Sequence, residues 1–473
     1  MQMFIGGKKT DSRDGKVIDI INPATSELVD TVPSATVEDI AKAIEIAQEG
    51  KRIWAGTPMN VRTGILLKCA DAIERNKKEL STLLTMEMGK VIKESEGEIG
   101  VVVKLFRGFA EVANHMYGIT MPESPDLIFE RREPLGVVVC IVPFNFPAEL
   151  WAHKVAPALA MGNAVIAKPP SDNPLTVTRL TEILLGCGIP GSVLQILTGK
   201  GSIVGKYLSS SADVNAISFT GSTEVGLDLL KEGTNNLKKV FLELGGNDPM
   251  IIFDDADLDL AVDEAFFGRM LNNGQTCCAT KRFIVQNTIK EQFVNKVINK
   301  IKNMSIGDPL DYKTDAGPLI NESAAVEIEK QVELTLTQGA KCVIGGHRYN
   351  KTYFQPTLLD DVKPDMDIAK DMEVFGPVFP VIGFDTMEEA VKIANNTKYG
   401  LNGAVSTKDI NKAILVAKQM ECGTVVINGC SCYRVCDMAF GGYKMSGNGR
   451  EGFICTLEEM SQIKNIVIRN INK

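Results

Sequence analysis

Two adjacent cysteines, Cys277 and Cys278, stand in the segment NNGQTCCATKRF. A cysteine thiolate is a strong nucleophile that can form a covalent intermediate at a carbonyl carbon. Free cysteine is also a small apolar residue that is often buried. For the pair alone, core packing is the commoner explanation, so the rest of the chain must decide between the two.

Two other polar residues stand where catalysis could use them. Glu243 ends an apolar run before the two glycines of LELGG, where a lone carboxylate is a candidate general base. The alternative is a solvated glutamate at a strand end. Asn145, in the Pro-bounded turn of VVCIVPFNFPAELW, could donate to a developing oxyanion, or could close its own loop as an Asx turn.

Small residues suggest a nucleotide site. In AISFTGSTEVG, Gly221 and Ser222 lie between a strand-like and a helical run, so the free amides at the helix start could face a phosphate. Gly199 and Gly201 do not complete a GxGxxG fingerprint, because its final glycine is displaced. The pattern is compatible with a variant nucleotide-binding fold.

The elements that must position these residues form two groups. From residue 135, apolar runs such as LGVVVCIVPF and NAVIAKPP alternate with helical stretches, and a second alternation begins at PMIIFDD. Such alternation predicts parallel strands covered on both faces, in two α/β domains. Before them, a strand-like VIDIINPAT precedes amphipathic helices in the runs TVEDIAKAIEIAQEGKRIWAG and VRTGILLKCADAIERNKKELSTLLTMEMGK.

Two segments fit neither domain, residues 115–134 and the strand-like end SQIKNIVIRNINK. An exposed edge strand invites pairing with another chain, so we expect a homodimer or homotetramer.

The composition narrows the class of partner. The 473 residues carry a net charge of -8 with both signs interspersed, which argues against nucleic-acid or membrane binding and favours a small-molecule substrate. The eleven cysteines have no regular spacing, and no signal peptide or membrane-spanning run is evident, so we expect a cytoplasmic protein. Cys430, Cys432 and Cys436 lack a local fourth ligand for zinc, so we expect no metal.

Seven ordered motifs span the chain: FNFP, KPPS, FTGSTEVG, LELGG, GQTCC, EVFGPV and FGGYKMSGNGREG. Together they resemble the aldehyde dehydrogenase superfamily of the NAD(P)-dependent, non-acylating type. The resemblance implies an α/β fold with a Rossmann-like NAD(P)-binding domain (1–114 and 135–245), an α/β catalytic domain (246–445) and a small β oligomerisation element (115–134 and 457–473).

The resemblance also implies roles for individual residues. Cys277 would be the nucleophile, Glu243 the general base, Asn145 an oxyanion-hole donor together with the Cys277 amide, and Lys154 part of the proton-relay path. The implied NAD or NADP site comprises Phe144, Lys168, Ser171, Gly221, Ser222, Leu244, Gly245, Glu373 and Phe375. The implied substrate residues are Phe146, Glu149, His153, Cys278 and Arg434.

These roles imply oxidation of an aldehyde to a carboxylate through a cysteine thioester. Ser171 stands where many NAD-specific relatives carry glutamate, so NADP is a plausible cofactor. The loop with Arg434 resembles the branch of lactaldehyde, glyceraldehyde and succinate semialdehyde dehydrogenases, which favours a small polar or anionic aldehyde. Two alternatives remain: a coenzyme-A-acylating enzyme, and a catalytically silent binding or structural protein on this fold.

Overall fold

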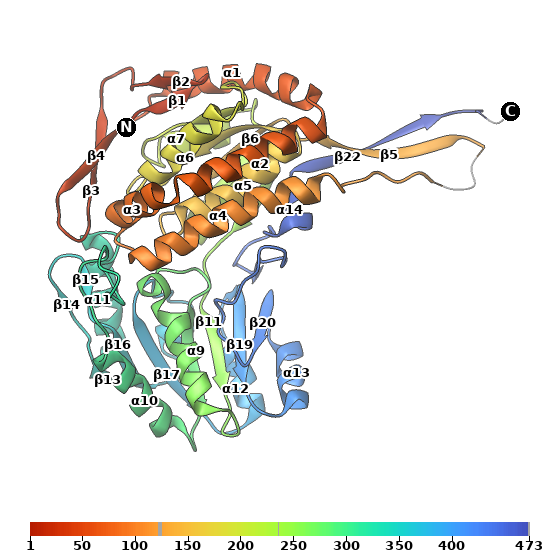
Figure 1. The fold of residues 1–473 in the computed structure, drawn as a ribbon. Coiled ribbons are helices and arrows are strands. Elements are labelled where there is room, and N and C mark those ends of the chain that lie inside the picture. Colours follow the sequence, from red (N-terminus) through yellow and green to blue (C-terminus); the bar gives the residue numbers. More distant parts are fainter. Residues whose placement is uncertain (122–124, 235, 472–473) are drawn as a thin grey trace.

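A computed structural model describes residues 1–121, 125–234 and 236–471. It has two lobes, each built on a seven-stranded sheet (Figure 1). The order in the first sheet is β10-β9-β6-β7-β8-β1-β2, and β6 to β10 run parallel. Its strands are β1 (Met3–Ile5), β2 (Lys8–Thr10), β6 (Val137–Ile141), β7 (Ala164–Lys168), β8 (Leu194–Ile196), β9 (Ala216–Thr220) and β10 (Lys239–Glu243).

Helices cover both faces of this sheet, so every residue of β6, β7 and β9 is buried. The connecting helices are α5 (Pro147–Ala160), α6 (Leu175–Gly186), α7 (Val204–Ser210) and α8 (Thr223–Gly233). An N-terminal layer adds α1 (Val37–Gly56), α2 (Met59–Arg75), α3 (Lys77–Met88) and α4 (Ile92–Ala113).

One predicted helical run is divided. The run from residue 61 to 90 forms α2 and α3, which meet at Asn76, where φ is -99° and ψ is 9°. The Asn76 side chain donates to the carbonyl of Ala72 at 2.8 Å, so asparagine supplies its own bond where the helix ends. Apolar spacing alone does not reveal this break, because both helices bury residues at the same period.

The second sheet has the order β13-β16-β17-β12-β11-β19-β20, and only β13 runs antiparallel to its neighbour. Its strands are β11 (Asp248–Ile252), β12 (Thr280–Gln286), β13 (Lys341–Ile344), β16 (Thr357–Val362), β17 (Val378–Phe384), β19 (Asn402–Ser406) and β20 (Thr424–Ile427). Its helices are α9 (Leu258–Met270), α10 (Lys290–Lys302), α11 (Glu322–Thr337), α12 (Met387–Asn395) and α13 (Ile410–Gln419). Short 3-10 helices span Leu271–Gly274 (η1) and Asp367–Ala369 (η2).

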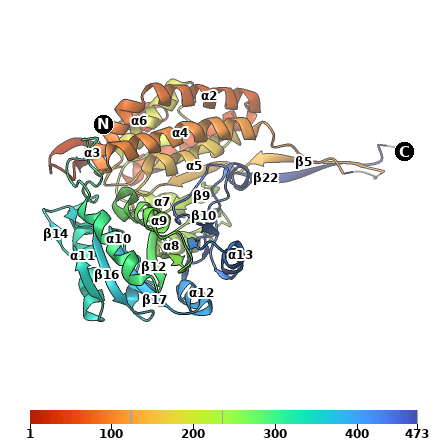
Figure 2. The same cartoon turned by 60° about the horizontal axis from the view of Figure 1, so that its bottom comes forward.

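Three short antiparallel pairs complete the lobes: β3 (Val17–Ile21) with β4 (Leu28–Pro33), β14 (Arg348–Tyr349) with β15 (Tyr353–Phe354), and β18 (Tyr399–Gly400) with β21 (Tyr443–Lys444). After α14 (Phe453–Glu459), the chain enters β22 (Ser461–Ile468), which pairs along its length with β5 (Leu127–Pro134). This two-stranded ribbon projects from the body in both views (Figures 1 and 2). Residues 122–124, 472 and 473 of the expected oligomerisation element lie outside the described residues.

Among the described helices, none is long and apolar enough to cross a membrane. In the same part of the chain, no three His, Cys, Asp or Glu side chains are grouped so as to hold a metal ion.

Candidate active site

A cavity of about 300 Å³ lies where the carboxyl ends of β6, β9 and β10 meet the loop between η1 and β12. This is the edge at which open α/β sheets bind ligands. The first lobe contributes Pro143, Phe144, Asn145, Thr220, Gly221, Ser222, Leu244 and Gly245, and the second contributes Cys277, Glu373 and Phe375. The cavity therefore gathers the expected nucleophile, the expected oxyanion donor and most of the expected nicotinamide-side residues.

The two cysteines of the opening motif have different surroundings. Cys277 lines the cavity and is partly exposed. Cys278 is 7% exposed and packs in a small apolar cluster with Leu401 and Phe440, away from the lining of this cavity. The pKa of the Cys277 thiol is raised well above its usual value. The larger cause is a hydrogen bond with the Cys278 thiol, and the second is burial. The expected nucleophile is therefore a thiol at rest, and it would have to lose its proton before it could attack a carbonyl carbon.

Asn145 lies in the turn between β6 and α5 and is 3% exposed. Its side-chain Oδ1 has no hydrogen-bond partner among the described residues, so this side chain does not close an Asx turn. The backbone carbonyl of Asn145 accepts a hydrogen bond from Asn272 Nδ2 at 3.0 Å. The backbone is thus held from the second lobe while the side chain remains at the cavity wall.

Glu243 is the last residue of β10 and is 5% exposed, so it is not a solvated glutamate at a strand end. Both carboxyl oxygens lack a hydrogen-bond partner among the described residues. Burial, and then the negative charge of Glu451, raise the pKa of Glu243 well above its usual value. Once it has lost its own proton, a buried, unpartnered carboxylate beside a cavity is a suitable proton acceptor for a thiol or a water molecule.

Lys154 belongs to a buried network that the sequence did not indicate. Its Nζ donates to Glu451 Oε1 at 3.0 Å, and Arg434 Nη2 donates to Glu451 Oε2 at 2.8 Å. Burial would raise the pKa of Glu451, but the charges of Lys154 and Arg434 outweigh it and hold that pKa below the usual range. Glu451 stands in the quoted motif FGGYKMSGNGREG, where a single acidic residue among glycines was the available signal.

The expected substrate residues lie next to this network. Arg434 Nη2 also donates to His153 Nε2 at 2.9 Å, and His153 Nε2 lies 3.9 Å from Glu149 Oε1. The pKa of His153 is lowered well below its usual value, mainly by burial and secondly by the positive charge of Arg434. The imidazole is therefore neutral. Arg434 is therefore not a free surface arginine. Phe146, at the start of α5, lies beneath Lys90, whose Nζ is 3.5 Å from the ring centroid.

A second cavity, of about 720 Å³, adjoins the first through Pro143, Thr220 and Gly221. Lys168 lines it, and burial lowers the pKa of this amine to about 8. At its edge, Ser222 caps α8 by accepting from the Val225 amide at 3.4 Å. The free amides of a helix start next to a large apolar hollow suit the diphosphate and adenosine of a dinucleotide.

The nicotinamide side of the site is held by charged and aromatic contacts. Glu373 Oε1 accepts from the Gly246 amide at 3.0 Å and lies 3.3 Å from Lys281 Nζ. A side chain at Gly245 would collide with Glu373, because its Cβ would lie 2.2 Å from Oε2. Phe144 and Phe375 meet edge to face, with ring centroids 5.9 Å apart and ring planes at 65°. The carboxylate suits ribose hydroxyls and the two rings suit a flat heterocycle, so the residues present fit NAD or NADP.

Ser171 is placed apart from both cavities. Its Oγ donates to the carbonyl of Gly199 at 3.0 Å and accepts from Lys168 Nζ at 3.4 Å. It lines a neighbouring hollow together with Asp172 and Lys200, close to the expected adenosine ribose.

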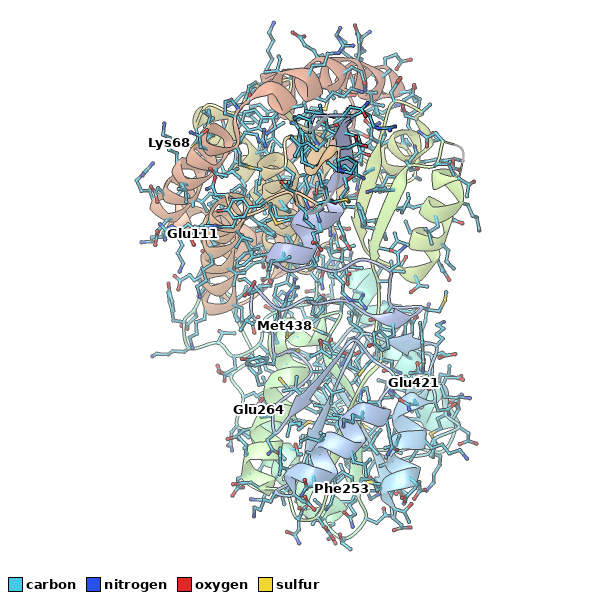
Figure 3. All side chains as sticks on the ribbon, turned by 90° about the vertical axis from the view of Figure 1, so that its right-hand side faces the viewer. Lys68, Glu111, Phe253, Glu264, Glu421 and Met438 are labelled. Atoms are coloured by element: carbon cyan, nitrogen blue, oxygen red, sulfur yellow. The ribbon has the colours of Figure 1, made fainter. Side chains whose placement is uncertain are left out.

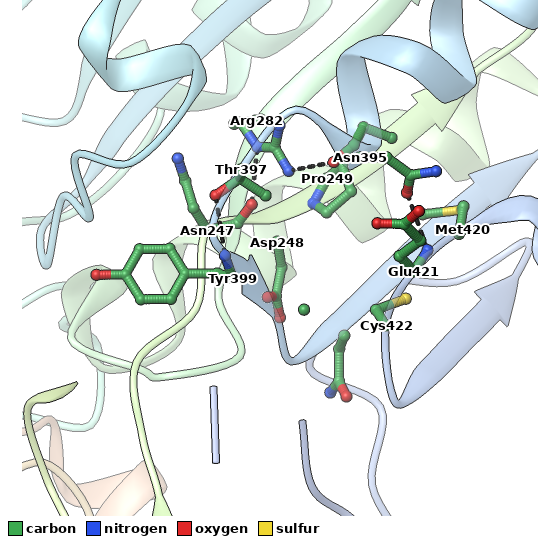
Figure 4. A pocket seen from close by; sticks show the side chains of 13 residues that line it. Asn247, Asp248, Pro249, Arg282, Asn395, Thr397, Tyr399, Met420, Glu421 and Cys422 are labelled. Carbon is green, nitrogen blue, oxygen red and sulfur yellow. Dashed lines mark hydrogen bonds between the residues drawn. The ribbon is translucent and has the colours of Figure 1, made fainter. Parts of the chain in front are cut away.

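A polar hollow in the second lobe has a structural role (Figure 4). Its volume is only about 10 Å³, hardly enough for one water molecule. Arg282 extends through it and donates to the carbonyls of Asn247, Ala369, Ile393 and Ala394 at 2.7 to 3.1 Å. These bonds tie β12 to the segments around it, so we assign the hollow to folding.

Comparison with known proteins agrees with this geometry. Residues 9–466 match the family model described as the aldehyde dehydrogenase family. A lactaldehyde dehydrogenase of Methanococcus aeolicus is 40% identical over 470 residues, covering 98% of this chain and 99% of the relative.

Two solved structures have the same fold. A glyceraldehyde-3-phosphate dehydrogenase of Methanocaldococcus jannaschii, complexed with NADP, is 39% identical with a TM-score of 0.92, covering 95% of this chain and 98% of that one. A betaine aldehyde dehydrogenase of Staphylococcus aureus, in complex with NAD+, is 36% identical with a TM-score of 0.96. The match covers 100% of this chain and 95% of that one. They confirm the α/β fold expected from the sequence, and their cofactors confirm the expectation of NAD or NADP. The chain belongs to the aldehyde dehydrogenase family and is an oxidoreductase that acts on aldehydes with NAD or NADP.

Proposed function

We propose that this enzyme oxidises a small polar or anionic aldehyde to its carboxylate through a thioester on Cys277. The observation that carries the proposal is the meeting of Cys277 and Asn145 at one cavity beside the buried, unpartnered Glu243. A nucleophile, an oxyanion donor and a proton acceptor are the groups that acyl chemistry requires.

The steps follow from these positions. Cys277 releases its thiol proton to water in the cavity and attacks the aldehyde carbon, whose carbonyl oxygen becomes the oxyanion that Asn145 and the Cys277 amide stabilise. A bound nicotinamide supplies the hydride acceptor. Glu243 then takes a proton from the water that hydrolyses the thioester. Lys154, which acts electrostatically on Glu243 and pairs with Glu451, belongs to the proposed path by which that proton leaves.

Charge around the substrate residues supports a polar substrate. Lys154 and Arg434 carry two positive charges, whereas burial raises the pKa of Glu149 to about 7 and that of Glu243 well above its usual value. Glu451 is the remaining anion, so the group is net positive while Glu149 and Glu243 are protonated and neutral once Glu243 has lost its proton to act as the base. We propose that the free edge of Arg434, with Phe146, Glu149, His153 and Cys278 around it, accommodates a hydroxyl, carboxylate or phosphate of the substrate.

The relatives do not select one aldehyde. Lactaldehyde, glyceraldehyde 3-phosphate and betaine aldehyde are named for proteins of 36 to 40% identity to this chain. Lactaldehyde, glyceraldehyde and succinate semialdehyde remain the candidates that we favour.

We further propose NADP as the preferred cofactor. Ser171 carries no negative charge near the expected adenosine ribose, and Lys168 and Lys200 bring positive charge that Asp172 beside them partly offsets. A carboxylate at this position would repel the 2′-phosphate, whereas serine does not.

At the level of the whole chain, we propose the domain division expected from the sequence. The first sheet comes from residues within 1–114 and 135–245, the second from within 246–445, and the ribbon from 127–134 and 461–468. We also propose a homodimer or homotetramer that assembles through the ribbon, and a cytoplasmic location.

The test is cofactor reduction with lactaldehyde, glycolaldehyde, succinate semialdehyde and propionaldehyde, each with NAD and with NADP. The proposal predicts higher kcat/KM for the polar aldehydes, with the free acid as product. Faster acyl-CoA formation when coenzyme A is added would favour the acylating alternative. No reduction with any aldehyde would favour the silent binding protein, and an efficiency at least about tenfold higher with NAD would contradict the NADP preference.

A further inference from the structure

On α4, Glu94 and Glu98 lie four residues apart, and Lys90 lies two residues before the helix begins at Ile92. Residues four apart lie on one side of a helix. None of the three lines the 300 Å³ cavity, but each contacts a segment that shapes it.

Glu98 and Lys90 hold the start of α5. Phe146, the N-cap residue of α5, provides no side-chain cap. Glu98 Oε1 supplies it from α4 by accepting from the amides of Ala148 at 2.9 Å and Glu149 at 3.2 Å. The other oxygen of Glu98 pairs with Lys90, and both side chains are fully buried. The turn that carries Asn145 is therefore fixed by α4.

Glu94 holds the other half of the site. Its Oε1 and Oε2 accept from the Asn272 amide at 3.2 and 3.1 Å. Asn272 has a φ of 52°, in the left-handed region. Its Nδ2 donates to the Asn145 carbonyl at 3.0 Å and to the Gln275 carbonyl at 3.3 Å. One asparagine thus joins α4, the Asn145 turn and the loop that leads to Cys277.

The two donors of the proposed oxyanion hole come from different lobes, since Asn145 follows β6 and Cys277 precedes β12. α4 contacts the segments that carry both donors, so it can set their separation. We propose that Lys90, Glu94 and Glu98 are positioning residues that hold the Asn145 side chain and the Cys277 amide at the spacing an oxyanion needs. The inference rests on the proposed function. Donors must lie about 2.7 to 3.1 Å from the oxyanion, and a misplacement of about 1 Å can cost roughly a hundredfold in rate.

The first test measures the rate of the first turnover of cofactor reduction in Glu94→Ala and Glu94→Gln. We expect Glu94→Ala to lower this rate by about tenfold to a hundredfold, with unchanged dissociation constants for NADP. Glu94→Gln keeps an acceptor oxygen and should recover part of the loss, and it replaces Glu94→Ala where the latter fails to fold. Glu111→Gln, exposed on the same helix beyond this site (Figure 3), is the control that retains the wild-type rate.

A double-mutant cycle then separates positioning from general stability. If Glu94 acts through Asn145, the first-turnover rate of Asn145→Ala/Glu94→Ala is little lower than that of Asn145→Ala alone. Losses that multiply would overturn the inference, as would a wild-type first turnover in Glu94→Ala. Failure of the proposed function is distinct, because the wild-type enzyme would then reduce no cofactor with any aldehyde.

Discussion

At the residue scale, the site contains a buried cluster of opposite charges. Arg434 and Lys154 both donate to Glu451, and Glu451 acts electrostatically on Glu243. A buried ion pair of this kind is seldom kept for stability alone, because desolvation offsets the attraction. Here the charges set the protonation of the carboxyl group that activates water in the proposed mechanism.

The adjacent cysteines should respond differently to the same substitution. Cys277→Ser should abolish aldehyde oxidation, because a serine hydroxyl at this position is a far weaker nucleophile than a thiolate. Cys278→Ser should leave the activity within about tenfold of wild type, because its side chain packs in the Leu401 and Phe440 cluster. Steady-state assays of both variants decide the point; equal losses would reject the assignment of Cys277.

Glu451→Gln should move the acidic limb of the pH profile of kcat to lower pH. The negative charge of Glu451 raises the pKa of Glu243, and Lys154 and Arg434 lower it. The substitution removes the first effect and leaves the two cations uncompensated, so both changes lower the pKa of Glu243. The carboxyl group then loses its proton at a lower pH. Asp437→Asn, exposed in the Arg434 loop, is the control; a limb that stays in place would contradict the coupling.

At the element scale, each reactive group stands at the end of a regular element. Glu243 ends β10, Asn145 precedes α5, and Cys277 lies between η1 and β12. The buried apolar runs made the strands predictable, and the small residues of FTGSTEVG made the start of α8 predictable. Two features were not predictable from the sequence. The break at Asn76 interrupts no apolar period, and the cap that Glu98 provides to α5 depends on a contact between distant segments.

The η1 segment stores backbone strain, since Asn272 and Asn273 both have positive φ, at 52° and 54°. Asn273 Nδ2 donates to the carbonyls of Gly317 and Pro318. Asn273→Gly and Asn273→Val both lose these bonds. The backbone must be left-handed in both variants, but only valine is strained in that conformation. We expect the valine variant to be less stable by about 1 to 2 kcal/mol in denaturant unfolding. Equal free energies of unfolding would show that this strain is unimportant.

At the scale of the whole molecule, the two lobes meet along the segment that contains Met438 (Figure 3) and enclose the site between them. The alternation of apolar and helical runs predicted two α/β units, and the family resemblance of the motifs predicted most of the residues that line the cavity. The sequence did not predict the role of Glu451, because only the contact between the lobes brings its partners Lys154 and Arg434 to it.

The projecting ribbon of β5 and β22 predicts association between copies. Its exposed apolar residues include Ile463, Val467 and Ile468, at 53%, 48% and 44% exposure. Light scattering of the wild type should give a dimer or tetramer, and Ile463→Lys/Val467→Lys should lower the oligomeric mass. Ile410→Lys, an exposed position on α13, is the matched control. A monomeric wild type at micromolar concentration would reject this surface.

The central claim is that the aldehyde is oxidised while covalently bound to Cys277. Glu243→Gln should slow hydrolysis of the thioester more than its formation, because the group that activates water is lost. Intact-protein mass spectrometry, after rapid acid quenching of this variant with lactaldehyde and NADP, measures the intermediate directly. We predict a mass increase equal to one acyl group, located on the peptide that contains Cys277 and absent in Cys277→Ser/Glu243→Gln. Cofactor reduction with no acylated Cys277 peptide would contradict the account.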